Sequence, residues 1–413
     1  MPNIKVAHFT TQLQGGAGIA TQRLHFALCR HGVGSRLYFG TGQSVDETTI
    51  PAFRNASLFW GSVARVANSW RSRRTAPGGF VTSPGWIRRT PIQKFGPVPR
   101  VINLHWVARW LDLPTFFDSL PANFPVVWSL HDLIPVTGGC NHPAECDNFT
   151  RECGNCPQLI KPKPHDETYK FFHVKDRNYA NLNLHFVGNS EWTTTQIRRS
   201  GLAKHARTIR TIPLGLDVKQ YRPIDKAIAK KALGIPEGRF VVGFACVDLS
   251  DLRKGADLLQ EALNEFGYDN ISLITCGSGA WPDSARVETL HLGVLRSTRL
   301  QCLFYSALDV FVISSRAETF GNTAIEAMAC ETPVVAYAAG GLKDVVVSGE
   351  TGLLEPEIGS VSGLTGMFQW MAQHPIERQT MGVAARQRVL TRFTDTLMAQ
   401  RYSHMYEQLL SPV

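Results

Sequence analysis

Short apolar runs that alternate with helix-like segments are the feature of this sequence that most restricts its fold. In the first half these runs lie at 5–9, 35–39, 101–105, 126–130, 184–187 and 208–212. In the second half they lie at 240–245, 271–276, 310–313 and 334–337. Apolar strands separated by helices form right-handed β-α-β units and parallel sheets. The sequence therefore predicts an α/β protein with two doubly wound, Rossmann-like domains.

The same alternation divides the chain into parts. The first series of runs gives way to the second at 213–217, and a helix-like segment at 394–410 closes the chain. Doubly wound domains bind ligands at the carboxyl ends of their strands, so two of them are expected to share a cleft. The predicted parts are an N-terminal domain (1–214), a C-terminal domain (215–390) and a terminal helix (391–413). The N-terminal domain includes a basic insert (48–111) and a cysteine-rich loop (137–160).

Composition places the chain among ordinary globular proteins. Its 413 residues are 44% hydrophobic and 19% charged, which excludes a disordered, collagen-like or coiled-coil chain. No apolar stretch approaches the roughly 18 residues that a membrane span needs, and the start of the chain lacks the pattern of a signal peptide. We therefore expect a cytoplasmic protein. The net charge of +9 predicts an anionic partner.

The positive charge is concentrated in the segment 48–111, which contains neither Asp nor Glu. Within it, four large apolar side chains recur at helical spacing and three arginines follow: Phe59, Val63, Val66 and Trp70, then Arg71, Arg73 and Arg74. Such a helix is typical of binding to an anionic membrane, here the inner face of the cell membrane. A core-packed helix with a solvated basic end is the alternative. Nucleic acid is not expected, because no recognised binding module accompanies the charge.

A glycine-rich turn follows the first predicted strand and contains Gly16 and Gly18. Backbone N–H groups at such a turn suit a phosphate, although a tight turn without any ligand explains the glycines equally well. A dinucleotide-binding site is excluded by a missing acidic residue. The second strand should end in a carboxylate that holds the ribose, but the first acid after it is Asp46, in a loop.

Two carboxylates lie on either side of a predicted helix start. Glu318 lies in the loop after the strand that ends at Ile313, and Glu326 lies on the second turn of the helix that starts near Asn322, about 6 Å along its axis. The helix N-terminus between them would hold an anion. A sugar–diphosphate–nucleoside has this layout of hydroxyls, anion and ribose diol. The alternative, a loop residue and a solvated helix residue, is disfavoured because Glu326 has apolar neighbours.

The spacing of Glu318 and Glu326, together with the runs at 326–330, 333–335 and 340–344, resembles family 4 of the retaining GT-B glycosyltransferases, of the bacterial exopolysaccharide and colanic-acid type. The resemblance implies a terminal helix that crosses back to the first domain and chemistry that needs no metal. It also implies a set of site residues. These are the catalytic residues Glu318 and His131 and the donor-binding residues Lys254, Arg253, Thr319, Phe320, Gly321, Asn322, Glu326, Gly16 and Gly18.

The sequence departs from the family pattern at two places. The family usually has an Arg just after the first strand of the second domain. Here Lys254 is present without that Arg, so either Arg253 replaces it or the phosphate clamp is weaker. The usual Gly before Thr-Pro-Val-Val is Glu331, which would alter only a helix end. His131 matches the family's cleft histidine, which hydrogen-bonds donor-sugar oxygens. A core histidine paired with Asp132 is the alternative.

Four clustered cysteines have the spacing C-x5-C-x6-C-x2-C: Cys140, Cys146, Cys153 and Cys156. The last pair has the spacing of a zinc knuckle, and four thiolates can close a tetrahedral structural site. The first pair is too widely spaced for a full match, so free thiols are the alternative. No catalytic metal is expected.

The resemblance predicts a retaining enzyme that transfers a sugar from a nucleotide-sugar donor to a glycan or lipid-linked acceptor in bacterial envelope polysaccharide assembly. A UDP-sugar epimerase with the same architecture, and a nucleotide-sugar-binding protein without catalysis, are the alternatives. Residues 291–297 are expected to contact the donor base, but their types do not distinguish uridine from guanosine.

Overall fold

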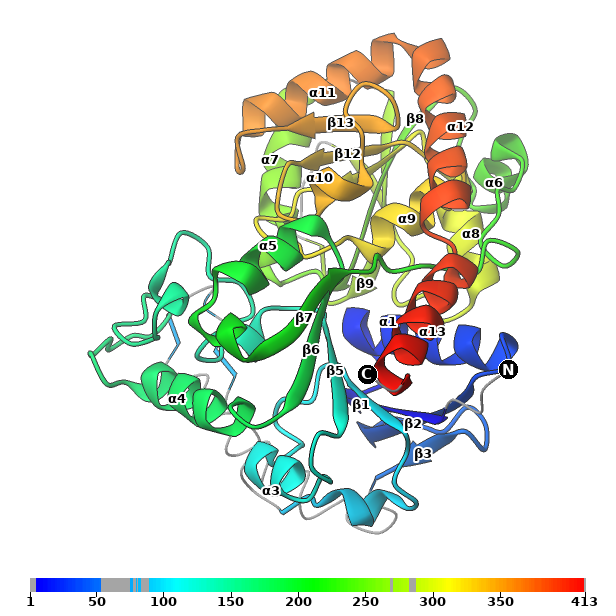
Figure 1. Ribbon diagram of the computed structural model, residues 1–413. Coiled ribbons are helices and arrows are strands. Elements are labelled where there is room, and N and C mark those ends of the chain that lie inside the picture. Colours follow the sequence, from blue (N-terminus) through cyan, green and yellow to red (C-terminus); the bar gives the residue numbers. More distant parts are fainter. Residues whose placement is uncertain are drawn as a thin grey trace. The chain divides into compact units, whose positions relative to one another are not determined.

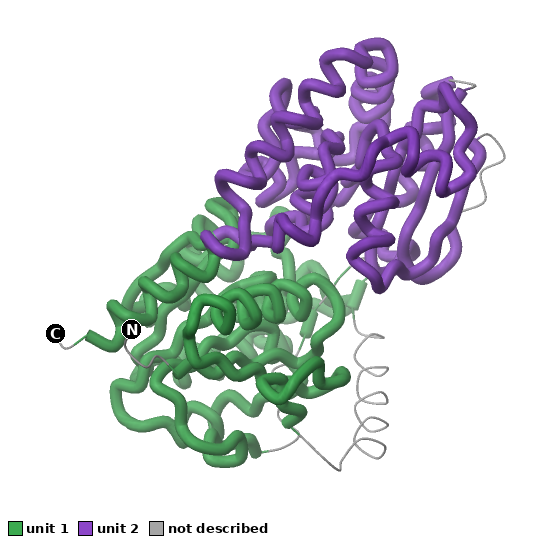
Figure 2. Tube along the Cα trace, turned by 90° about the vertical axis from the view of Figure 1, so that its right-hand side faces the viewer, with its two compact units in different colours: residues 1–212, 398–413 green, residues 213–397 purple. Residues whose placement is uncertain are grey.

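The computed structural model describes residues 5–52, 75–76, 79, 81–82, 89–267, 270–281 and 287–411. The helix predicted around Phe59–Arg74 lies outside these residues, as do Phe80 and Trp86 of the basic insert. The chain divides into two compact units. Unit 1 comprises Met1–Ile212 and Met398–Val413, and unit 2 comprises Pro213–Leu397 (Figure 2).

Unit 1 contains a seven-stranded sheet in the order β3-β2-β1-β4-β5-β6-β7, with every pairing parallel (Figure 1). Its strands are β1 (Lys5–Gln12), β2 (Gly34–Thr41), β3 (Thr49–Pro51), β4 (Val101–Leu104), β5 (Pro125–Leu130), β6 (Asn183–Gly188) and β7 (Ala206–Thr211). Its α-helices in the described residues include α1 (Gly15–Arg30), α3 (Leu113–Asp118), α4 (Glu167–Tyr179) and α5 (Glu191–Arg199).

Unit 2 contains a six-stranded parallel sheet in the order β10-β9-β8-β11-β12-β13. The strands are β8 (Phe240–Asp248), β9 (Ile271–Ser278), β10 (Glu288–His291), β11 (Val310–Ile313), β12 (Val334–Tyr337) and β13 (Gly352–Glu355). The helices are α6 (Lys226–Ala232), α7 (Ala256–Phe266), α8 (Thr298–Ala307), α9 (Asn322–Ala329), α10 (Leu342–Val345), α11 (Val361–Gln373) and α12 (Pro375–Arg392). The predicted fold class of two doubly wound parallel sheets is confirmed.

The terminal helix α13 (Asp395–Leu410) joins unit 1 from Met398 onward, which confirms the predicted crossing back to the first domain. A buried polar network attaches it there. Asn103 Nδ2 on β4 donates to the Tyr406 hydroxyl at 2.7 Å, and Ser129 Oγ on β5 lies 2.7 Å from the Tyr402 hydroxyl. Both tyrosine rings are buried, so the helix is held by packing and by these hydrogen bonds together.

A left-handed residue lies two positions after the end of helix α9. Glu331 has a φ of +61°, and its backbone N–H donates to the Met328 carbonyl. Glycine adopts this conformation without steric penalty, whereas a residue with a Cβ does not. The departure of Glu331 from the family's glycine therefore falls at the end of the helix that carries Glu326.

Candidate functional site

The loop between β11 and α9 positions the first carboxylate and the helix N-terminus in unit 2. Gly321 precedes the helix with a φ of +101°, and a Cβ there would lie 2.7 Å from Leu342 Cδ2. Thr319 and Phe320 are buried, and the Phe320 ring packs edge-on against Phe393, with centroids 5.7 Å apart. The Phe320 side chain therefore supports the loop from within unit 2.

Lys254 and Glu318 form an ion pair in this loop region. The Lys254 ammonium lies 2.6 Å from Glu318 Oε2, and the two side chains are 22% and 16% exposed. Lys254 ends the short helix η5 (Leu252–Lys254), and Gly255 follows in a left-handed conformation. A Cβ on Gly255 would lie 2.0 Å from the Ser314 carbonyl oxygen. The Lys-Gly sequence thus lets η5 approach the end of β11 closely enough for the pair to form.

Arg253 does not point into the same contact as Lys254. Its guanidinium pairs with Asp251 at 2.9 Å and lies 3.4 Å from the Ala317 carbonyl oxygen. Arg316, which the sequence did not single out, forms a two-pronged ion pair with Asp257 at 2.9 and 2.6 Å. This hydrogen bonding raises the pKa of Arg316 and lowers that of Asp257. Arg316 therefore ties the loop to the first turn of α7.

Glu326 is buried within α9, with only 7% of the residue exposed. The Tyr305 hydroxyl on α8 donates to Glu326 Oε2 at 2.8 Å. Burial raises the pKa of Tyr305 well above its ordinary value, so this group remains a neutral donor. A solvated helix residue is thereby excluded for Glu326. Its carboxylate is held in one orientation, as a binding residue requires.

His131 lies in unit 1, directly after β5, and is half-buried. Its Nε2 is 2.9 Å from His105 Nδ1, and the two rings stack with centroids 5.2 Å apart. Burial lowers the pKa of His131 to about 4, so the ring is neutral at physiological pH. Asp132 is the partner expected if His131 is a core histidine. Its carboxylate accepts hydrogen bonds from Trp106 Nε1 and from the Ile134 backbone N–H.

The glycine-rich turn is part of helix α1, which begins at Gly15. Gly18 lies inside the helix, where a Cβ would be 2.5 Å from the Gln12 carbonyl oxygen. This close approach explains why position 18 is a glycine without any ligand. Gly16 is exposed on the first turn, and Gln14 makes no side-chain cap to the helix. Packing therefore explains Gly18, whereas Gly16 lies on the exposed surface of the helix.

The four clustered cysteines line one small cavity of about 10 Å³ in unit 1. The Gly138 backbone N–H donates to Cys153 Sγ at 3.0 Å, and burial raises the pKa of both Cys140 and Cys153. Lys175 is buried close by and donates to the Thr137 carbonyl at 2.7 Å. Within the described residues, no three His, Cys, Asp or Glu side chains are arranged to hold a metal ion. The thiols are neighbours but are not a preformed ligand set.

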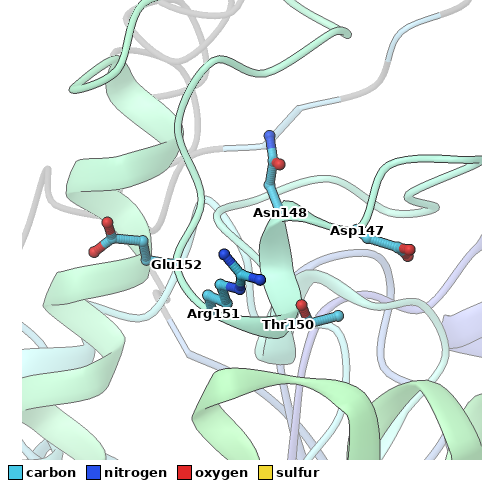
Figure 3. Close-up of a pocket in the computed structure, with 5 residues that line it drawn as sticks. All are labelled: Asp147, Asn148, Thr150, Arg151 and Glu152. Atoms are coloured by element: carbon cyan, nitrogen blue, oxygen red, sulfur yellow. The ribbon is translucent and has the colours of Figure 1, made fainter.

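A surface pocket of about 480 Å³ is formed by this loop itself and is lined by Asp147, Asn148, Thr150, Arg151 and Glu152 (Figure 3). Asp147 pairs with Arg199 at 2.6 Å, and Glu152 lies 3.0 Å from His173 Nε2. None of the residues that the sequence predicted for the site lines this pocket.

Sequence reasoning missed Tyr305 and His105. Nothing near Tyr305 in the sequence marks it, because its contact with Glu326 joins two different helices. His105 did carry a signal. It is the last residue of the predicted run 101–105 and directly follows β4 in the structure, as His131 directly follows β5, and the carboxyl ends of neighbouring parallel strands meet at one edge of a sheet.

Residues 225–388 match the family described as Glycosyl transferases group 1. A D-inositol 3-phosphate glycosyltransferase from Catenulispora acidiphila is 34% identical over 165 residues, which cover 35% of this chain and 39% of that protein. A second protein of that description, from Kribbella flavida, is 34% identical over 189 residues, or 41% and 44% of the two chains. The match thus spans less than half the length of these relatives.

Solved structures match along nearly the whole chain. Sucrose-phosphate synthase from Thermosynechococcus elongatus has a TM-score of 0.67 at 21% identity, covering 98% of this chain and 99% of its own. HepE from Anabaena, solved with UDP-glucose, has a TM-score of 0.65 at 17% identity, covering 98% and 100%. At these identities the likeness shows the fold. Residues 225–388 therefore resemble the group 1 glycosyltransferase family, within a chain that has the two-sheet GT-B fold.

Proposed function

We propose that this protein is a retaining glycosyltransferase that moves a sugar from a nucleotide-sugar donor to a glycan or lipid-linked acceptor in bacterial envelope polysaccharide assembly. The observation that carries the proposal is the contact between Lys254 and Glu318 beside the N-terminus of α9, in a segment that matches the family. The Anabaena relative solved with UDP-glucose supports a donor of this class.

Each group of this site has a part in the proposed reaction. The Lys254 ammonium has three N–H donors, so it can stay bonded to Glu318 and also donate to the donor's diphosphate. The backbone N–H groups at the start of α9 face the same negative charge. Both stabilise the charge that grows on the leaving phosphate without reorganising during the reaction. Glu318 would hold sugar hydroxyls and Glu326 the ribose diol.

Titration of the purified protein with UDP-, GDP- and ADP-sugars tests the site, because a bound ligand raises the thermal midpoint by mass action. We expect one donor class to bind and Lys254→Ala to weaken its binding by tenfold or more, on the order of 1.4 kcal/mol. Lys231→Ala is the control, since it removes the same charge from an exposed position on α6. Equal losses in both variants would refute the assignment of Lys254.

Product analysis separates the alternatives. A glycosyltransferase joins the sugar to an acceptor, an epimerase converts the donor into its stereoisomer, and a binding protein leaves the donor unchanged. The anomeric configuration of the product, compared with that of the donor, tests the retaining outcome.

We also propose that the cysteine loop holds a structural zinc ion. Its four thiols line one cavity, and a backbone N–H already donates to one of them. The Cys153–Cys156 turn passes through Gly154 and Asn155, both at positive φ. The buried Lys175 ammonium would offset part of the negative charge of four thiolates. Binding would require the thiols to converge further than they do here.

Elemental analysis of protein purified without chelator tests the zinc site. We expect one zinc ion per chain, lost in Cys153→Ser and retained in Cys276→Ser, which changes a buried cysteine on β9. Absence of zinc from the wild-type protein would refute the proposal. A loss of catalysis on zinc removal while the loop stays folded would refute its structural role.

The basic insert 48–111 is proposed to dock the protein on an anionic membrane, near a lipid-linked acceptor. No helix of the described residues is long and apolar enough to span a membrane. Each basic residue near such a surface contributes on the order of 1 kcal/mol, which salt weakens. We expect flotation with anionic vesicles but not neutral ones, and its loss when Arg71, Arg73 and Arg74 become Glu. Equal binding to both vesicle types would contradict this.

A further inference from the structure

Three histidines form a continuous hydrogen-bonded chain through the sheet of unit 1. His8 lies on β1, His105 directly follows β4 and His131 directly follows β5, and these three strands are neighbours in the sheet. His8 Nδ1 is 3.0 Å from His105 Nε2, and His105 Nδ1 is 2.9 Å from His131 Nε2. His8 and His105 are buried at 0% and 3% exposure. The chain thus runs from the interior of the sheet to its carboxyl edge.

All three rings are neutral, because burial lowers the pKa of His131 to about 4 and those of His8 and His105 well below their ordinary value. A neutral imidazole has one N–H donor and one acceptor nitrogen. The two hydrogen bonds must therefore run in the same direction along the chain. Either His8 donates to His105 and His105 to His131, or both bonds are reversed.

The inner end of the chain distinguishes these two directions. His8 Nε2 is buried and has no hydrogen-bond partner among the described residues. His25, whose ring centroid lies 6.1 Å from that of His8, uses its nitrogens on Ser35 Oγ at 2.7 Å and Thr48 Oγ1 at 2.8 Å. If the bonds ran inward, His8 Nε2 would carry a buried N–H without an acceptor, and such groups are rare in folded proteins. If the bonds run outward, from His8 toward His131, His8 Nε2 carries a lone pair and no hydrogen.

We infer that His8 and His105 are positioning residues that hold His131 as the Nδ1–H tautomer. His8 Nδ1–H donates to His105 Nε2, and His105 Nδ1–H donates to His131 Nε2. His131 then bears its proton on Nδ1 and acts there as a hydrogen-bond donor, which suits a sugar or phosphate oxygen. This last step rests on the proposed function together with the family resemblance, which implies that His131 hydrogen-bonds donor-sugar oxygens. The tautomer itself follows from unit 1 alone.

The matched variants are His105→Asn and His105→Leu, whose side chains have nearly the same size and shape. The Asn amide nitrogen is as many bonds from Cβ as His Nδ1, so it can keep the donor to His131, whereas Leu cannot. Nitrogen NMR of the intact, histidine-labelled protein reports which ring nitrogen carries the proton. We expect Nδ1–H at His8, His105 and His131 in the wild type, which is the minor tautomer of a histidine side chain in water. In the variants we expect it at His131 with Asn but not with Leu.

Catalysis provides a second, separable measurement. His105→Leu should lower the transfer rate by tenfold or more with the affinity for the nucleotide unchanged, and His105→Asn should restore most of the rate. A wild-type His131 protonated on Nε2, or the same His131 tautomer in both variants, would overturn the inference. Should the Leu variant not fold, the wild-type and Asn spectra still decide it. If the tautomers are as inferred and neither variant loses transfer, the proposed role of His131 is wrong instead.

Discussion

Tyr406→Phe tests how the terminal helix is held to the first sheet. The substitution removes one oxygen and leaves the buried ring in place, so it isolates the hydrogen bond from Asn103 Nδ2. The Asn103 amide would then keep a buried N–H without an acceptor. Leaving such a group unsatisfied costs about 1–3 kcal/mol. For a domain of this size that corresponds to a fall of about 2–4 °C in the thermal midpoint for each kcal/mol.

Tyr402→Phe, one helical turn away, is the matched control. Ser129 Oγ donates to Asn103 Oδ1 at 3.0 Å, so its bond to Tyr402 must be one in which the tyrosine donates. Losing that donor leaves only a lone pair on Ser129 unsatisfied, and the serine keeps its other bond. We therefore expect a smaller loss of stability, about 0.5–1.5 kcal/mol.

Urea unfolding followed by circular dichroism measures both variants. The midpoint should fall while the slope m stays constant, since the surface exposed on unfolding does not change. The double variant Asn103→Leu/Tyr406→Phe should lose less than the sum of its single variants, because the two groups share one bond. The reasoning would be refuted if Tyr406→Phe were as stable as the wild type, or if Tyr402→Phe were the less stable of the two.

Three further outcomes follow from the second unit. Glu331→Gly should raise the free energy of unfolding by about 0.5–1 kcal/mol in urea titrations, because it removes a Cβ from a left-handed position. It gives up only a partly exposed ion pair of 3.8 Å with Arg386. A loss of stability would show that the ion pair contributes more than the backbone strain costs. Glu326→Ala should weaken donor binding by calorimetry, whereas Glu318→Ala should lower mainly the transfer rate, and wild-type behaviour of both would remove the basis for the site. Gly255→Ala should reduce both stability and donor affinity, since a Cβ there meets the Ser314 carbonyl at 2.0 Å, and unchanged values of both would contradict that close approach.

The buried strands of the two sheets could be predicted from the sequence. β11 and β12 have the bounds that their apolar runs predicted, and all their residues are buried. β3 has three residues and β10 is largely exposed, so neither carries an uninterrupted apolar run, and neither was predicted. A continuous apolar run marks a strand that is buried on both faces of its sheet, so a short or exposed strand at the edge of a sheet lacks this signal.

The candidate site divides in the same way. Glu318 and Glu326 could be related from the sequence because they lie within one loop and one helix, where the spacing along the chain fixes the spacing in space. The Lys254–Glu318 contact joins residues 64 positions apart, and Tyr305 reaches Glu326 from another helix. Helical periodicity contains no information about either contact.

The sequence by itself determined the class of fold, the helix that places Glu326 and the family resemblance, because each depends on neighbours along the chain. Only the tertiary structure decided which groups face one another. His8 and His105 are 97 positions apart, and their hydrogen bond exists because the sheet order brings β1 beside β4. Ring neutrality likewise comes from burial, which is a property of the folded interior. Local patterns select the elements, and the packing of those elements sets the chemistry of their side chains.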